Sequence, residues 1–176
     1  MTATRSAPTS LSTPTSAART VVIEAVQAAL AAEHAAVYGY GVVGARLVGN
    51  QRDAAHAALA SHHAYRDSLV RTLRDLGATP AAAAPAYELP FPVSDPVTAE
   101  RLGSVLEEGV AAVYADLVQA GTGELRRTAT AALRESALRA IHWRGSSVPF
   151  PGLPELSATE ASPTPSHRPN HEPGET

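Results

Sequence analysis

Four polar side chains interrupt otherwise apolar helical patterns, and their types suit chemistry inside a protein: Glu33, His62, Arg66 and Glu107. Carboxylates and an imidazole that face one another can hold divalent cations such as iron or manganese. A guanidinium among them allows another interpretation, a buried network of ion pairs and hydrogen bonds. The choice between the two depends on the segments that position these residues.

Two residue types are missing, and their absence narrows the chemistry. The chain contains no cysteine and no lysine, which excludes disulfides, thiolate nucleophiles, Cys-ligated iron–sulfur clusters and Schiff-base catalysis. The formal charge is −3 with arginines scattered among acids, so no basic stripe for nucleic acid is present. No apolar run reaches the roughly 20 residues of a membrane span, and residues 1–20 lack the apolar stretch of a secretory signal. We therefore expect a cytoplasmic protein without nucleic-acid or membrane partners.

The apolar pattern predicts an all-α fold. Apolar residues recur at spacings of three and four in four segments, at about residues 20–48, 51–76, 96–120 and 123–144. The composition is 44% apolar but only 5% aromatic, which suits closely packed helices better than a sheet. Predicted helix ends support these boundaries, because Gly49, Gly77 and Gly145 can terminate helices and Asp95 followed by Pro96 can begin one.

The lengths of the connections predict the topology. The first two helices and the last two are joined by turns of a few residues, whereas residues 78–94 form a long Pro- and Ala-rich link. A helix of about 26 residues is about 39 Å long, and this link can extend to about 56 Å. The link is long enough to cross the whole bundle, which predicts the ferritin-like four-helix bundle with a long crossover between helices 2 and 3. The alternative is a plain up-down-up-down bundle with a loose loop. The crossover is favoured because apolar side chains of the link can pin it to the bundle: Tyr87, Leu89, Phe91 and Val93.

The ends of the chain differ in composition from its middle. Residues 1–18 and 155–176 are rich in Pro, Ser and Thr with few bulky apolar side chains, and both are expected to be disordered tails. The predicted bundle occupies residues 19–154.

The turn between the first two helices places the polar residues at similar heights. It puts Glu33 level with Arg66 and one helical turn from His62. A crossover that starts the third helix beside the start of the second also brings Glu107 level with His62. We therefore predict one buried polar layer in the middle of the bundle.

Three features favour an ion-pair network over a metal centre in this layer. Di-metal ferritin-like bundles use a Glu from two helices and a Glu-x-x-His from each of the other two, and neither 51–76 nor 123–144 contains that motif. Glu135 should face solvent, since it projects about 130° from the apolar stripe of its helix. Arg66 would repel a dication. Under the alternative hypothesis, the metal ligands are Glu33, His62 and Glu107.

Other candidates are weaker. Asp53 and His56 have carboxylate–imidazole spacing, but they lie far from the layer and are expected at a helix start and on the surface. Tyr38, Tyr40 and Tyr114 are expected to be packing residues with hydrated hydroxyls. The sequence shows no Ser-His-Asp arrangement, phosphate-binding glycine loop or dinucleotide fingerprint.

Several segments resemble an uncharacterised ferritin-like family known as domain of unknown function 4439. They are AAEHAAVYGYGVVGARL (31–47), HHAYRDSL (62–69), PAYELPFPV (85–93), LEEGVAAVYADLV (106–118), and HWRG (142–145) with FPGLPEL (150–156). The resemblance covers about residues 20–156 and implies a ferritin-like fold with no assigned activity. It implies no catalytic residues. Against the wider metal-binding ferritin-like pattern, Glu33 and Glu107 match its single glutamates, but Leu59 stands where a Glu should precede His62.

These observations favour a ferritin-like domain without metal or other cofactor that acts through self-association, as a homodimer, or through a protein partner. They leave open whether the domain is an enzyme, and a non-enzymatic role is favoured. The alternative is an oxidoreductase of the ferritin-like class that uses iron or manganese with a reduced set of ligands.

Overall fold

The computed structural model describes residues 16–145, which form four α-helices and no strand. The helices are α1 (Ser16–Arg46), α2 (Gly49–Asp75), α3 (Pro96–Ala120) and α4 (Gly123–Arg144). The predicted all-α class is therefore confirmed, and the helix ends lie within a few residues of those expected. Residues 16–18, assigned above to a tail, are the start of α1. The other residues of both predicted tails, and 146–154 of the predicted bundle, lie outside the described residues.

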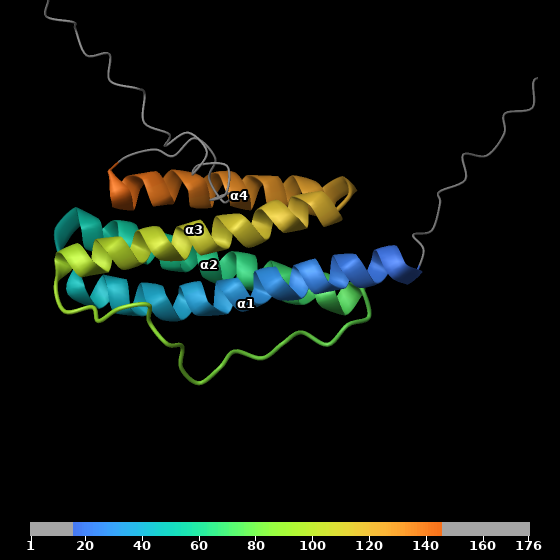
Figure 1. The fold of residues 1–176 in the computed structure, drawn as a ribbon, viewed down its shortest axis with the longest axis horizontal. Helices are drawn as coiled ribbons and strands as arrows, with labels where there is room; N and C mark the ends of the chain where they lie inside the picture. The colour runs from blue at the N-terminus through green and yellow to red at the C-terminus, as the bar shows by residue number, and fades with distance from the viewer. Residues whose placement is uncertain (1–15, 146–176) are drawn as a thin grey trace, which may run out of the picture.

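The long link determines the directions of the helices. In Figure 1, α1 and α2 run in opposite directions, and the link after α2 returns along the outside of α1 to the end of the molecule where α2 began. As a result, α3 runs in the same direction as α2, and α4 runs back beside α3. The closest helix pairs are α1 with α2, α1 with α3 and α3 with α4. The backbones of α2 and α4 approach one another less closely, which leaves a seam between them that side chains must fill.

Local sequence explains how these helices begin and end. Asp95 accepts a hydrogen bond from the backbone N–H of Thr98 at 2.8 Å, and the Thr98 hydroxyl accepts one from the Asp95 N–H at 3.2 Å. This reciprocal capping box starts α3. Gly49 has a φ of 55°, a left-handed conformation that costs glycine little. It is the first residue of α2, so Gly49 begins this helix, whereas the sequence suggested it as the end of the helix before.

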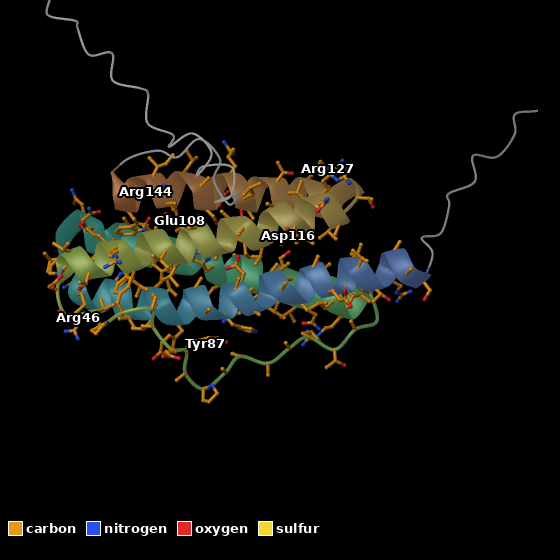
Figure 2. All side chains as sticks on the ribbon, in the orientation of Figure 1. Arg46, Tyr87, Glu108, Asp116, Arg127 and Arg144 are labelled. Atoms are coloured by element: carbon orange, nitrogen blue, oxygen red, sulfur yellow. The ribbon has the colours of Figure 1, made fainter. Side chains whose placement is uncertain are left out.

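Side chains of α1 hold the link in place. Gln27 donates to the carbonyl of Thr79 at 2.7 Å and accepts from the N–H of Ala81 at 3.0 Å. Farther along, the rings of Tyr38 and Tyr87 lie 5.6 Å apart, and Figure 2 shows Tyr87 on the link below α1. The other three apolar link residues expected to pin it pack into one end of the core: Leu89, Phe91 and Val93. The link is therefore fastened along the length of α1.

The core consists of two apolar clusters. One cluster contains Leu30, Leu69 and Leu117 among its buried residues, and the other contains Val43 and Leu102 among its own. Along α2 and along α3, buried polar residues separate the residues of one cluster from those of the other. The polar site described below is thus built into the interior, with apolar packing toward either end.

Helix α1 is unusually apolar. By length and composition alone it could cross a membrane, with a mean hydropathy of 1.3 over its best window. Core helices of soluble proteins meet the same criterion. In this structure α1 packs against both α2 and α3 and contributes Val26, Leu30 and Val43 to the core.

Candidate polar site in the helical core

Three of the four predicted layer residues meet in the interior. Glu33 from α1, His62 from α2 and Glu107 from α3 are each fully buried. Nδ1 of His62 lies 2.7 Å from Oε2 of Glu33, and Nε2 of His62 lies 3.2 Å from Oε1 of Glu107. The imidazole therefore bridges two carboxylates that come from different helices.

The two carboxylates around His62 favour the doubly protonated form of its ring. An ionised carboxylate only accepts hydrogen bonds, so both ring nitrogens must donate and the ring must be an imidazolium. Burial by itself lowers the pKa of His62, but the hydrogen bonds and charges of Glu107 and Glu33 outweigh burial and raise that pKa above its ordinary value. The bridge therefore consists of two charge-assisted hydrogen bonds.

Two buried tyrosines donate hydrogen bonds to the two carboxylates, each to the glutamate on the other helix. Tyr114 of α3 donates to Oε1 of Glu33 at 2.7 Å, and Tyr40 of α1 donates to Oε1 of Glu107 at 2.6 Å. Each tyrosine follows the glutamate of its own helix by seven residues, which is about two helical turns. Each one, however, bonds to the glutamate of the other helix. Glu33 and Glu107 thus tie α1 and α3 together twice.

The sequence suggested that these tyrosine hydroxyls are hydrated, but both are buried and bonded to carboxylates. Burial and the neighbouring carboxylates raise the pKa of both Tyr40 and Tyr114, so both remain protonated donors. Tyr40 also accepts a hydrogen bond from Nε1 of Trp143 at 2.7 Å, and its ring stacks on His62 with centroids 5.0 Å apart. The site thus receives an aromatic side chain from α4 as well.

The arginine of the layer is Arg139, and the prediction of Arg66 is wrong. Arg66 keeps 28% of its side chain exposed and pairs with its neighbour Asp67, at 2.9 Å from Nε and 2.8 Å from Nη2. Arg139 of α4 instead donates from Nε to Oε1 of Glu107 at 2.5 Å. Its other side faces Glu135 on its own helix, at 3.5 Å from Nη1.

The charges of the layer balance. Glu33 and Glu107 are negative, and the His62 imidazolium and Arg139 guanidinium are positive. Burial opposes the charge of Glu107, but His62 and Arg139 together lower the pKa of its carboxyl. Burial likewise opposes the charge of Arg139, and Glu107 raises its pKa. Each charge is therefore stabilised by an opposite one within hydrogen-bonding distance.

This arrangement does not fit a metal ion. A metal needs a free imidazole lone pair, and both nitrogens of His62 carry protons that are donated to carboxylates. Residues 16–145 contain no group of three His, Cys, Asp or Glu side chains placed to hold a metal. Within the network, Oε2 of Glu107 is the buried oxygen without a hydrogen-bond partner, and one carboxylate oxygen is not a coordination site.

The fold and the site together define an all-helical protein with a buried, hydrogen-bonded ion-pair layer. The family described as a domain of unknown function (DUF4439) matches residues 25–155, and the chain belongs to that family. No role is assigned to the family. The match ends at residue 155, beyond the described part of the chain, which ends at residue 145.

Over most of its length the chain is similar to a solved structure. It is the crystal structure of a conserved hypothetical protein, rv2844, from Mycobacterium tuberculosis, with 31% sequence identity and a TM-score of 0.71. The similarity covers 86% of this chain and 99% of that one. No curated protein matches the chain.

Proposed function

We propose that this chain is a ferritin-like four-helix bundle that works without a metal and acts by associating with a second copy of itself. The long link and the resulting helix directions support the ferritin-like class, in which one crossover joins two helical hairpins. The site lies where that class places its inward-facing ligands. Here a network of ion pairs takes the place of a metal centre.

One observation carries this proposal: each ring nitrogen of His62 lies within hydrogen-bonding distance of a different carboxylate, at 2.7 and 3.2 Å. Arg139 supplies a second fixed positive charge at Glu107. A dication entering the layer would have to displace a proton from His62 and approach the guanidinium, so the network opposes metal binding electrostatically. The layer is thereby suited to hold the bundle in one arrangement.

Surface features support self-association. Val48 and Val97 are 72% and 75% exposed, and the α1–α2 turn and the start of α3 lie at the same end of the molecule (Figure 1). These valines are the two most exposed large apolar side chains among the described residues, and burying such side chains against a second copy would remove apolar surface from water. The net charge of −3 is small, so two copies would repel one another only weakly.

Metal analysis tests the first half of the proposal against an oxidoreductase built on Glu33, His62 and Glu107. The protein would be purified anaerobically with iron or manganese and analysed for both elements. We expect less than about a tenth of a metal per chain and no change of melting temperature when metal is added. Stoichiometric metal that is lost in a His62→Gln variant would establish the oxidoreductase alternative instead.

Light scattering over a range of concentrations tests the second half. We expect a discrete dimer that the double change Val48→Asp and Val97→Asp dissociates. The matched control is Val21→Asp, since Val21 is also exposed, at 54%, but lies near the other end of α1. A strictly monomeric wild-type protein would contradict self-association, and a stable complex with a different protein would replace it by a heterologous partner.

A further inference from the structure

The seam between α2 and α4 contains a cavity of about 240 Å³ beside the polar layer. The cavity lies between these two helices, and residues of α3 form its floor. Leu69 of α2, Leu117 of α3 and Ala129 of α4 line it, and at most 4% of each is exposed. The cavity therefore reaches the buried core and is more than a surface groove.

The cavity exists because small side chains face the seam from α4. Ala129 is completely buried and lines the cavity, and the next inward position, Ala132, is also a buried alanine. The backbones of α2 and α4 do not come close enough to close the space that Ala129 leaves. Space of this kind normally costs stability in a core.

The lining selects an uncharged ligand. Glu124 is the charged residue among the residues that line the cavity, and its carboxylate is already paired with Arg127 at 2.6 Å. Among the described residues no cation lines the cavity, so an anionic ligand would find no cationic partner there and would meet a carboxylate at the rim. The rings of Tyr65 and Tyr114 form an aromatic wall, with centroids 5.9 Å apart.

We propose that this cavity binds a small, neutral, apolar molecule, such as a single aromatic ring or a hydrocarbon chain of similar size. A dry cavity of about 150 Å³ holds benzene, so this one accommodates one substituted ring. The ligand would also contact the network from its apolar side, because Tyr114 lines the cavity while its hydroxyl donates to Glu33 at 2.7 Å. This site is independent of metal binding and of self-association.

Toluene and benzoate are suitable probes, since both carry one ring and they differ in charge. Binding to the full-length protein would be measured by ligand-observed saturation-transfer NMR and by the shift of the melting temperature. Ala129→Leu fills the cavity from α4, and Ser68→Leu fills it from α2. Ala131→Leu is the matched control, because Ala131 lies on the exposed side of α4.

We expect saturable binding of toluene with a dissociation constant on the order of 0.1–1 mM and none of benzoate. Binding should weaken at least tenfold in each folded filling variant and remain unchanged in Ala131→Leu. Circular dichroism identifies which variants fold, and Ser68→Leu provides the result if Ala129→Leu does not. The proposal is overturned if toluene does not bind saturably, if benzoate binds equally well, or if toluene binding is unaffected in a folded filling variant.

Discussion

Replacing Arg139 by methionine removes one charge from the balanced layer and leaves its other members in place. Oε1 of Glu107 would keep Tyr40 at 2.6 Å and His62 at 3.2 Å but would lose the guanidinium at 2.5 Å. The layer would then contain two carboxylates and one imidazolium. Methionine has a similar length and is apolar, so the variant tests charge more than packing.

The expected loss of stability follows from burial. Breaking a buried ion pair by removing one partner costs about 3–5 kcal/mol, because the remaining charge is uncompensated. Glu107 is fully buried, but 19% of the Arg139 side chain is exposed and Glu107 keeps two donors. We therefore expect the lower end, about 3 kcal/mol. For a domain of this size that lowers the melting temperature by about 10 °C.

Urea unfolding and thermal melts, both followed by circular dichroism at pH 6, measure this loss. The matched control is Arg127→Met on the same helix. The side chain of Arg127 is 73% exposed and its partner Glu124 is 79% exposed, so that change should alter the free energy of unfolding by no more than about 0.5 kcal/mol. Figure 2 shows Arg127 on the outside of α4.

The double variant Arg139→Met with Glu107→Gln isolates the charge effect. Glutamine keeps an oxygen for Tyr40 and removes the unpaired charge, so Glu33 and the His62 imidazolium again balance. We expect recovery of about 1.5–2 kcal/mol relative to Arg139→Met alone. If Arg139→Met costs less than about 1 kcal/mol, or if the double variant recovers nothing, Arg139 does not stabilise the layer by charge.

Three further predictions concern the same network. The raised pKa of His62 means that its stabilising contribution is fully present below the unfolded-state value of about pH 6.5 and is lost as pH rises through the folded-state value. The free energy of unfolding, measured by urea titration from pH 6 to 9, should therefore fall by up to about 1.4 kcal/mol per pH unit, and a His62→Gln variant should lack that slope. Tyr114→Phe removes a donor from buried Glu33 and should cost about 1–3 kcal/mol in urea unfolding; a loss near zero would mean that water replaces the hydroxyl. Arg66→Met should shift the melting temperature by less than about 3 °C, since Arg66 pairs only at the surface, and a shift near 10 °C would return Arg66 to the core.

Much of the fold and half of the network could be predicted from the sequence. The lengths of the turns and the link fix which residues stand at the same height, and this placed Glu33, His62 and Glu107 together. These three also lie on apolar stripes, where a polar residue must be buried. Their shared height follows from the rise per residue of an α-helix.

The sequence pattern indicated the wrong arginine because an α-helix has 3.6 residues per turn, so the inward position can fall on either of two neighbouring residues. The inward positions of α2 include Ala58, His62 and Leu69, and between His62 and Leu69 either Tyr65 or Arg66 can fit a spacing of three or four. Arg66 has a local partner in Asp67 that keeps it at the surface, whereas Tyr65 turns toward Tyr114. Sequence periodicity alone cannot weigh these contacts.

A shift of the same kind hid Arg139. A stripe that starts at Ala129 with a spacing of three or four can continue at Ala132 or at Leu133, and the buried positions of α4 are Ala132 and Ser136. That rotation moves Arg139 next to Glu107. The sequence does contain a pattern that indicates the two tyrosines, since a Glu-x₆-Tyr spacing occurs in both α1 and α3. The spacing does not show that each tyrosine bonds to the glutamate of the other helix.

The crossed pairs make the two helical hairpins dependent on each other for folding. The α1–α2 hairpin contains Glu33, whose hydroxyl donor Tyr114 belongs to the other hairpin, and the α3–α4 hairpin contains Glu107, whose donor Tyr40 belongs to the first. Either hairpin alone would expose its apolar face and leave its carboxylate without that donor. The molecule should therefore unfold as one cooperative unit, and a chain cut within the link should regain its structure only when both halves are mixed.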